Sequence, residues 1–578
     1  MSVEKLIVDH MATWTTALQT RSTAGRGSSG KIDLYGIKKL RELILELAVR
    51  GKLVPQDPND EPASELLREM KKQQEDLIKE RKIKKPKKLP SIDGTLESIS
   101  VPQGWELCYL NDIGDWGAGA TPNRTNSGYY GGDIPWFKSG ELSEDYITDS
   151  EEHITALALK EYSLRDNQPG DVLIAMYGAT IGKTSILNSR STTNQAVCAC
   201  TPFDGLSNQY LLIFLKASKK VFTAMGAGGA QPNISKEKIV ATLFALPPLN
   251  EQLRIVKKVE QLMSLCDQLE QQSLTSLDAH QQLVETLLGT LADSQNAEEL
   301  AENWARISEH FDTLFTTEAS VDALKQTILQ LAVMGKLVPQ DPNDEPASEL
   351  LKRVAQEKAQ LVKEGKIKKQ KPLPPISDEE KPFEIPTSWE WVRFGTITTS
   401  RLGKMLDKAK NKGTPKKYIR NVNVQWDNIF LDDINEMKFE DNELSEFILK
   451  NGDLLVCEGG EPGRCAIWNK PGEFYFQKAL HRVRTFCNIP TKILAIHLKN
   501  DSSNGRLENL FTGVTIKHLP GDKLQQYVIP LMPLNEQNNI IAKLNLLLDI
   551  CDNLINEIKT AQQTQLHLAD ALTDAAIN

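Results

Sequence analysis

Residues 51–67 read GKLVPQDPNDEPASELL, and residues 335–351 read the same seventeen letters 284 positions later. The repetition continues outside this block, because PLNEQ at residues 248–252 returns at residues 533–537, one position out of register. Solenoid repeats have periods of about 20–50 residues, so this period indicates a duplicated unit made of a domain and helices. The sequence therefore predicts an approximate internal two-fold and a partner that is read in two places.

The composition is that of an ordinary globular protein, with 578 residues, 40% hydrophobic and 25% charged. This length predicts about three or four packed units. No run of about 18 apolar residues is present, and charges stand where a signal peptide would need an apolar core. We therefore expect a cytoplasmic protein without a membrane partner. The eight cysteines are dispersed and lack matching histidines, so neither a disulfide framework nor a metal site is expected.

Charge is distributed unevenly along the chain. The net charge of −9 argues weakly against nucleic acid, but Lys and Arg concentrate in residues 71–88, 352–371 and 401–420. The first two stretches are typical of solvated tethers, whereas the third lies among Gly and Asn inside a domain, where phosphate contact is an equal alternative. Between residues 100 and 247, acidic residues outnumber basic ones by 15 to 11, which is the observation least favourable to DNA binding.

Local patterns predict the order of the elements. Residues 37–49 are apolar at helical spacing and stop at Gly51, which predicts a helix with a glycine terminator. Residues 25–30, rich in Gly and Ser, predict a flexible joint, and residues 63–80 predict a highly charged helix. From about residue 100 to 246 the chain contains short β-type runs, of which the clearest are residues 172–177 and 196–200.

A long helix is predicted after each β-rich segment. Residues 250–291 contain no proline, and Leu253, Val256, Val259, Leu262, Leu265 and Leu269 form an apolar seam. Such a helix is on the order of 60 Å long. Its duplicate spans residues 535–575, so we expect the two to pair as an antiparallel spacer between the two β-rich domains.

Two motifs resemble catalytic motifs without meeting their requirements. Residues 178–184, GATIGKT, are one residue too short between the glycines for a phosphate-binding P-loop. The duplicate position has Gly460, Gly463 and Arg464, so a basic residue after a glycine turn is present twice, which favours contact with a phosphate backbone. The Pro-Pro pairs lack the neighbours of an amino-methyltransferase loop, and no nucleophile–base grouping stands out. We therefore expect no catalytic residues in this chain.

Taken together, these features resemble the specificity subunit of a Type I restriction–modification system. The order of two β-rich domains, each followed by a matching long helix, is similar to that family over nearly the whole chain. The motifs that carry the resemblance in the first domain are GATP at 119–122, YYGGDIPW at 129–136, GDVL at 170–173, GATIGK at 178–183, NQA at 194–196 and PPLNEQ at 247–252. Those in the second domain are GKML at 403–406, YIRNVNV at 418–424 and GDLLVCEGG at 452–460.

The resemblance implies an α+β fold in which two β-rich globular target-recognition domains are joined by two long antiparallel helices, with an internal pseudo-two-fold duplication. The expected boundaries are 1–99 for an N-terminal helical region with a charged linker, 100–248 for target-recognition domain 1, 249–383 for central helices and a second charged linker, 384–533 for target-recognition domain 2, and 534–578 for a C-terminal spacer helix.

The resemblance also implies a mechanism. Each domain would read one half of a bipartite, asymmetric target in double-stranded DNA, with the half-sites about 10 bp apart centre to centre. The helices and residues 37–67 and 321–351 would dock two modification subunits, which carry S-adenosylmethionine and methylate adenine N6 after base flipping. Restriction subunits would translocate DNA with ATP and Mg²⁺. No cofactor is expected in this chain.

Base recognition favours Arg and Lys toward guanine, and Asn and Gln toward adenine. The DNA-contacting residues expected in the first domain are Thr121, Arg124, Lys138, Tyr177, Thr180, Lys183, Gln195, Gln231 and Asn233. Those expected in the second domain are Arg401, Lys404, Lys410, Lys416, Arg420, Asn423, Arg464 and Lys478. For each of them, an ordinary surface or turn-forming role is the alternative.

Two other classes of protein fit the same features. One is a stand-alone sequence-specific DNA-binding protein or repressor, which would bind DNA tightly by itself. The other is a coiled-coil scaffold whose β-rich domains bind protein, with an affinity that does not depend on salt.

Overall fold

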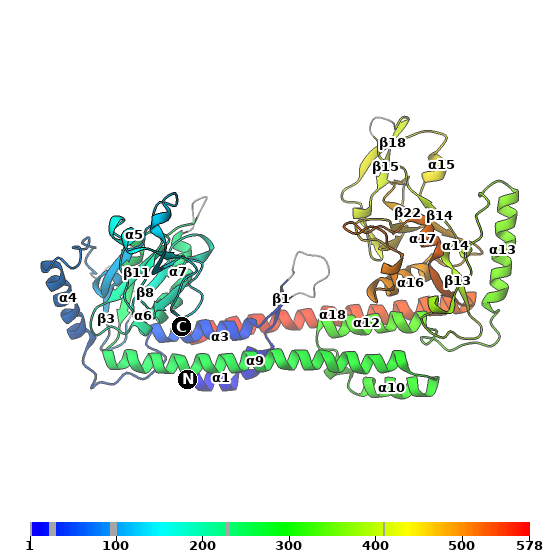
Figure 1. Cartoon of the computed structure of the whole chain (residues 1–578). Coiled ribbons are helices and arrows are strands. Elements are labelled where there is room, and N and C mark those ends of the chain that lie inside the picture. The colour runs from blue at the N-terminus through cyan, green and yellow to red at the C-terminus, as the bar shows by residue number, and fades with distance from the viewer. Residues whose placement is uncertain (1–2, 22–30, 93–100, 227–231, 408–410, 578) are drawn as a thin grey trace. The chain divides into compact units, whose positions relative to one another are not determined.

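The computed structural model describes residues 3–21, 31–92, 101–226, 232–407 and 411–577. The chain forms two compact units (Figure 1). Unit 1 contains residues 1–276 and 561–578, and unit 2 contains residues 277–560. The predicted flexible joint at residues 25–30 lies outside the described residues.

Two long helices belong to both units. Helix α9 (Leu249–Asp293) begins in unit 1 and ends in unit 2, whereas α18 (Leu534–Ile577) begins in unit 2 and ends in unit 1. Both predicted long helices are therefore confirmed, and each compact unit contains the start of one and the end of the other. None of the helices in the described part of the chain has the length and apolar character needed to cross a membrane.

The remaining helices are shorter. Those of unit 1 are α1 (Val3–Asp9), α2 (Met11–Thr16), α3 (Tyr35–Val49), α4 (Ala63–Lys79), α5 (Ala156–Glu161), α6 (Asn208–Ala217), α7 (Lys219–Gly226) and α8 (Lys236–Val240). Those of unit 2 are α10 (Ala297–Glu309), α11 (Phe311–Leu314), α12 (Glu318–Val333), α13 (Ala347–Lys363), α14 (Phe394–Ile397), α15 (Leu444–Phe447), α16 (Thr491–Ser503) and α17 (Gly521–Gln526).

The β-rich domain of unit 1 contains a five-stranded sheet of order β4-β11-β8-β9-β6 and a three-stranded sheet of order β10-β5-β7. Strands β3 and β12 pair separately, as do β1 and β2. The bounds are β1 (Gln19–Arg21), β2 (Lys31–Asp33), β3 (Glu106–Tyr109), β4 (Gly114–Ala118), β5 (Tyr130–Phe137), β6 (Tyr146–Ile147), β7 (His153–Ile154), β8 (Val172–Ala175), β9 (Thr184–Leu187), β10 (Thr192–Thr193), β11 (Val197–Pro202) and β12 (Leu243–Leu246). The two strands predicted most clearly are β8 and β11, which pair antiparallel in the centre of the larger sheet.

The β-rich domain of unit 2 repeats this arrangement. Its sheets have the orders β14-β22-β19-β20 and β18-β15-β21, while β13 pairs with β23 and β16 with β17. The bounds are β13 (Glu390–Arg393), β14 (Thr398–Leu402), β15 (Thr414–Ile419), β16 (Val424–Gln425), β17 (Asn428–Ile429), β18 (Asn435–Phe439), β19 (Leu454–Cys457), β20 (Cys465–Ile467), β21 (Tyr475–Phe476), β22 (Leu480–Thr485) and β23 (Val528–Leu531). The duplication seen in the sequence thus includes the sheet topology.

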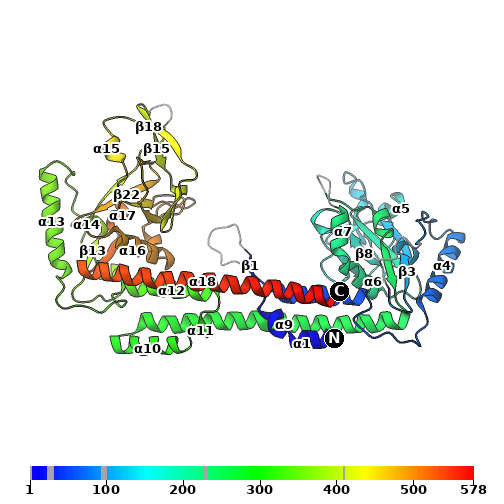
Figure 2. The same cartoon turned by 180° about the vertical axis from the view of Figure 1, so that it is seen from behind.

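In each unit, one helix of the β-rich domain packs against the duplicated helix that precedes the repeated block. Helix α6 contacts α3 in unit 1, and α16 contacts α12 in unit 2 (Figures 1 and 2). Apolar spacing explains why α3 forms, because Ile37, Leu40, Ile44 and Leu47 fall on one buried face. In unit 2, the same hydrophobic core includes α12, the end of α9 and the start of α18.

The seam predicted for α9 is correct except at Leu253 and at Leu265, which is half-buried beside the fully buried Cys266. Val256, Val259, Leu262 and Leu269 are buried, but Leu253 is 53% exposed. Its place in the seam is taken by Ile255, which is fully buried. The register shifts because the first turn of α9 is held by polar contacts instead of apolar packing.

Those polar contacts centre on a buried carboxylate in the PLNEQ motif. Glu251 is 1% exposed. It accepts hydrogen bonds from Trp105 Nε1 at 2.9 Å and from Gln56 Nε2 at 3.1 Å. Burial raises the pKa of Glu251. The same contacts recur in unit 2, where the three residues are Glu536, Trp389 and Gln340.

The repeated block also holds the C-terminal end of a long helix in each unit. Lys52 Nζ donates to the carbonyl oxygen of Ile577 at 2.7 Å, at the last residue of α18. Its duplicate, Lys336, donates to the carbonyl oxygens of Ala292 and Ser294 at 2.6 and 2.9 Å, where α9 ends. A cation at a helix C-terminus satisfies free carbonyls and opposes the negative end of the helix dipole.

Gly51 and Gly335 link this block to the β-rich domains. Both have positive φ, +65° and +74°, which favours glycine. A Cβ atom at Gly51 would lie 2.4 Å from Pro102 Cγ, and one at Gly335 would lie 2.7 Å from Pro386 Cγ. The block is therefore identical in both copies partly because it fits against the same proline in each domain.

We predict that Glu251→Ala destabilises unit 1 by roughly 2–5 kcal/mol, because Trp105 Nε1 and Gln56 Nε2 would lose their buried acceptor. Glu251→Gln keeps one acceptor oxygen and should cost less. Scanning calorimetry would measure the change. Gln272→Ala, an exposed position on the same helix, serves as a control and should change stability by less than about 0.5 kcal/mol. Equal midpoints for Glu251→Ala and the control would contradict the role assigned to this carboxylate.

Candidate nucleic-acid interface

One end of the larger sheet in domain 1 gathers loops from distant parts of the chain. Met176 N donates to Ala196 O at 2.8 Å, Asn194 N to Phe137 O at 3.0 Å, and Ile234 N to Met176 O at 2.9 Å. These backbone bonds hold the ends of β5 and β8 beside the start of β11. We call this surface rim 1, and it consists of residues 119–121, 137–141, 176–183, 194–196 and 232–234.

A glycine permits the closest approach within rim 1. A Cβ atom at Gly119 would lie 2.0 Å from Thr193 O, and the next residue, Ala120, donates its N–H to that oxygen at 3.1 Å. In domain 2, Gly403 has the same relation to Gln477 O, at 2.2 Å. The first letters of the GATP and GKML motifs are therefore required by backbone packing, which leaves the following side chains free to differ.

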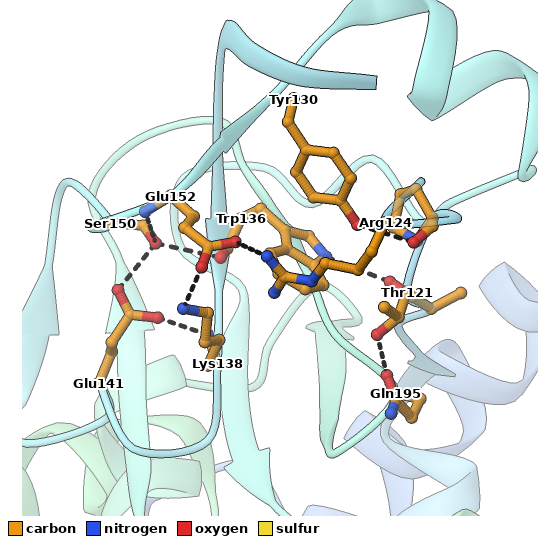
Figure 3. Close-up of polar contacts among 11 residues, drawn as sticks. Thr121, Arg124, Tyr130, Trp136, Lys138, Glu141, Ser150, Glu152 and Gln195 are labelled. Atoms are coloured by element: carbon orange, nitrogen blue, oxygen red, sulfur yellow. Dashed lines mark hydrogen bonds and ion pairs between the residues drawn. The ribbon is translucent and has the colours of Figure 1, made fainter. Parts of the chain in front are cut away.

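Next to rim 1, one glutamate holds two of the predicted DNA-binding cations (Figure 3). Glu152 pairs with Lys138 Nζ at 2.6 Å and with Arg124 at 2.8 Å. The Lys138 contact is the main cause of the lowered pKa of Glu152, and Arg124 adds to it. The Arg124 guanidinium also lies over Tyr130 and Trp136, with its carbon 5.1 and 5.3 Å from the ring centroids. Both cations are thus positioned, and their charge is partly neutralised.

Rim 1 contains Lys138 and six of the other predicted residues of domain 1. Thr121 donates to the Gln195 side chain, as Figure 3 shows. Lys183 Nζ donates to Gly140 O at 3.3 Å, and Thr180 donates to Tyr177 O at 2.6 Å. Rim 1 also contains Tyr177, which is 42% exposed, and the exposed Asn233 with which it forms a β-bridge. Gln231 lies outside the described residues.

Strand register identifies the equivalent surface in domain 2. Cys457 N donates to Arg464 O at 2.8 Å, as Ala175 N does to Lys183 O. Arg464 is therefore the structural counterpart of Lys183. We call the surface rim 2, and it consists of residues 403–405, 420–423, 458–464, 477–479 and 518–519. By the same register, Lys478 corresponds to Gln195, Met405 to Thr121, and His518 to Asn233.

Most predicted cations of domain 2 have acidic partners. Lys416 pairs with Glu473 at 2.7 Å, Arg401 pairs with Glu446, and Arg420 pairs with Asp433. The Arg401 guanidinium carbon also lies 4.7 Å from the centroid of Phe447. Lys478 is exposed, and it has no side-chain ion-pair partner among the described residues. Lys410 lies outside the described residues.

Three of the predicted residues have structural roles that do not suit DNA contact. Lys404 is 9% exposed and pairs with Glu443, and burial lowers its pKa. Asn423 is 3% exposed and donates to Asp433 O at 3.0 Å. The side chain of Arg464 is 13% exposed, because it bonds to Glu461 and to Asn421 O. Lys404 and Asn423 are thus buried, and Arg464 holds the loop of rim 2, so DNA contact by these three residues stays a prediction.

Several residues of rim 2 carry no signal in the sequence that would select them. Glu458 Oε2 lies 3.3 Å from His518 Nδ1, and the His518 side chain is 44% exposed. Met405 and Val422 are 62% and 54% exposed. Apolar residues are usually read as core, and a histidine 60 positions from its partner has no local signal. Only the folded loops bring these four side chains to one surface.

The described residues contain no group of three or more His, Cys, Asp or Glu side chains that could hold a metal ion. Seven of the eight cysteines are buried, and all are free thiols.

Comparison with known proteins identifies the domains. A family model described as the Type I restriction modification DNA specificity domain matches the chain twice, at residues 102–279 and 386–563. The EcoAI specificity subunit of a Type I restriction enzyme from Escherichia coli is 49% identical over the full length of both chains. The EcoEI specificity subunit from the same species is 44% identical, also over both full lengths.

Solved structures show more distant likeness. A chain from a structure of the complex assembly of the type I R-M system has a TM-score of 0.47 and 15% identity, and the match covers 83% of this chain and 99% of that one. The crystal structure of the HsdS subunit from Thermoanaerobacter tengcongensis has a TM-score of 0.38 and 15% identity, with 83% and 98% coverage. On its two matched domains and its full-length relatives, the chain belongs to the family of Type I restriction–modification specificity subunits.

Proposed function

We propose that this chain is the DNA-reading subunit of a Type I restriction–modification complex. Rim 1 and rim 2 each read one half of a bipartite, asymmetric target in double-stranded DNA. Helices α9 and α18 set the unread distance between the half-sites, about one helical turn or 10 bp centre to centre. The proposal rests first on the membership of the chain in a family defined by a DNA specificity domain.

The observation that carries the proposal is that the rims share a backbone but differ in side chains. Equivalent positions hold Gln195 and Lys478, Thr121 and Met405, and Asn233 and His518. Amides suit adenine, lysine suits guanine, and an apolar side chain suits the thymine methyl group. Two equivalent surfaces with different hydrogen-bonding groups are expected to select two different half-sites.

The acidic balance of domain 1 fits this proposal when phosphate contacts are shared with a partner. Glu152 already occupies Arg124 and Lys138, which leaves Lys183 as the cation of rim 1 without an acidic partner among the described residues. Phosphate contacts supply much of the affinity for DNA without sequence selectivity. We infer that rim 1 contributes selectivity, and that modification subunits closing around the duplex contribute much of the affinity.

The repeated block supports the presence of two copies of one partner. Residues 55–59 are exposed or half-exposed, and residues 339–343 repeat their sequence with similar exposure. Hydrogen bonds to Glu251 and Glu536 explain why Gln56 and Gln340 are the same in both copies. They do not explain why the exposed residues beside these glutamines are also the same. We infer that residues 37–67 and 321–351, with the adjoining helices, dock two identical modification subunits.

In this proposal the chemistry takes place in the partner subunits. The modification subunits bind S-adenosylmethionine and methylate adenine N6, and the restriction subunits use ATP and Mg²⁺. This chain supplies binding and orientation, and it needs no cofactor of its own. The following experiments test the proposal, and the first also tells it apart from a stand-alone repressor.

Deletion of the gene should remove one adenine-methylated, two-part asymmetric motif from the host methylome, as measured by single-molecule sequencing. Complementation with the intact gene should restore the motif. If every methylated motif persists while the partner genes are expressed, the proposal is wrong. A repressor would change transcription without changing methylation.

Lys183→Gln and Gln195→Ala should have different effects on DNA binding by the assembled complex. Loss of one phosphate contact at Lys183 should weaken binding to all sequences alike and reduce the salt slope by about 0.9. Loss of a base contact at Gln195 should reduce discrimination at one base position by roughly 10–100-fold, which corresponds to about 1–3 kcal/mol, and leave the salt slope unchanged. Titrations of matched and singly substituted duplexes at several salt concentrations measure both effects. The roles are refuted if the two variants behave identically.

Glu152→Gln should strengthen binding to non-specific DNA, because it releases Arg124 and Lys138 toward phosphate. The salt slope should become steeper by about 1–2. The neighbouring Glu151→Gln removes the same charge from an exposed side chain and is the matched control. A Glu152→Gln complex with the non-specific affinity and slope of the control would show that Glu152 does not restrain these cations.

A further inference from the structure

Each charged helix beside a β-rich domain leads into an extended segment with a regular pattern of burial. After α4, the half-buried residues are Ile83, Pro86, Leu89 and Ile92, and the residues between them are exposed. After α13, the half-buried residues are Ile367, Gln370, Leu373 and Ile376, again with exposed residues between them. A strict period of three is the periodicity of a polyproline II helix. We call residues 83–92 and 367–376 the lysine ribbons.

The ribbons are anchored to their domains. In both copies the chain leaves the preceding helix in the same way, because Lys82 N and Lys366 N donate to Leu77 O and Leu361 O at 2.9 Å. Ile367 packs against the hydrophobic core of domain 2.

The far end of the second ribbon is held by a buried arginine. Arg393 is 6% exposed and donates to Pro374 O at 3.1 Å and Pro375 O at 2.8 Å. These contacts make the second ribbon part of the folded domain, whereas a solvated tether would make no such repeated contacts. The tether expected for residues 352–371 is therefore wrong, because residues 352–363 belong to α13 and residues 367–371 belong to this anchored ribbon.

The exposed positions of the ribbons carry unpaired lysines. Lys84, Lys85 and Lys88 in the first ribbon, and Lys368, Lys369 and Lys371 in the second, have no ion-pair partner among the described residues. By contrast, Lys82 and Lys366 at the base of the ribbons pair with Glu80 and Glu364, both at 2.8 Å. The positive charge is thus neutralised at the helix end and left free along the ribbon.

We propose that the two lysine ribbons bind the phosphate backbone of duplex DNA outside the bases that the rims read. Their apolar side chains face inward, so a partner meets mainly ammonium groups. Lysine is depleted in the cores of protein–protein interfaces, whereas it suits phosphate. Residues 84–88 span about 12 Å at 3.1 Å per residue and carry four lysines, a charge spacing close to the 3.4 Å per phosphate along one DNA strand.

This inference rests on the proposed function, because the ribbons act on the same DNA that the rims read. They supply affinity that does not depend on sequence. Together with the modification subunits, they offset the acidic balance of domain 1. The ribbons occur once in each unit, so each half-site has its own phosphate contact.

The test measures the salt dependence of DNA binding by the complex co-purified with its modification subunits. The variants are Lys84→Gln with Lys85→Gln, and Lys368→Gln with Lys369→Gln. The probes are a fluorescent duplex that contains the motif identified in the methylome and a scrambled duplex of the same length. Lys450→Gln with Lys470→Gln is the matched control, because these lysines flank β19 and β20 at the end of the sheet opposite rim 2.

For each ribbon variant, the salt slope should fall by about 1.8, since two phosphate contacts are lost. Affinity should fall by the same factor for both duplexes, so that discrimination is unchanged, and the control should match the wild type. An unchanged slope overturns the inference. Loss of modification subunits with an unchanged slope also overturns it, because the ribbons would then bind protein. If the wild-type complex fails to discriminate between the duplexes, the proposed function itself fails.

Discussion

The structure depends on a buried carboxylate at the start of each long helix. Glu251 and Glu536 receive N–H groups from a tryptophan of the β-rich domain and a glutamine of the repeated block. A buried charge of this kind is tolerated only when it is hydrogen-bonded. Each carboxylate therefore keeps its hydrogen bonds only when the β-rich domain, the repeated block and the long helix are folded together. A lysine of the repeated block also caps the end of the second long helix in each unit. Lys52 caps α18 and Lys336 caps α9, so this helix end is joined to the same three segments.

In this arrangement the backbone positions the rim loops, and the side chains of the rims provide the sequence selectivity. Backbone hydrogen bonds and two glycines position the rim loops, and equivalent bonds occur in both domains. Side chains at the rims are consequently free to change without loss of the fold. That freedom explains how a duplicated chain can hold Gln195 in one copy and Lys478 in the other. Binding residues are commonly carried on loops placed by a rigid scaffold for the same reason.

Charge in the molecule is divided in a similar way. Near the rims, arginines and lysines are mostly held by acidic neighbours, as Arg124 and Lys138 are by Glu152. Away from the rims, the lysine ribbons carry cations without acidic partners. Paired cations can be positioned for selective contacts, because their geometry is defined before DNA arrives. Unpaired cations favour any phosphate and add affinity without choosing a sequence.

Sequence alone determined the duplication, the two long helices, the central strands β8 and β11, and the motifs that mark the family, because these depend on local spacing and on repetition. It also selected most of the candidate residues of rim 1, since those residues lie within glycine-rich motifs. Tertiary structure alone decided which of the predicted polar side chains are exposed. Lys404 and Asn423 look like surface residues in the sequence but are buried by segments distant in the chain, and Met405 and His518 become exposed at a shared rim. Exposure and ion pairing depend on neighbours far apart in sequence, which local patterns do not record.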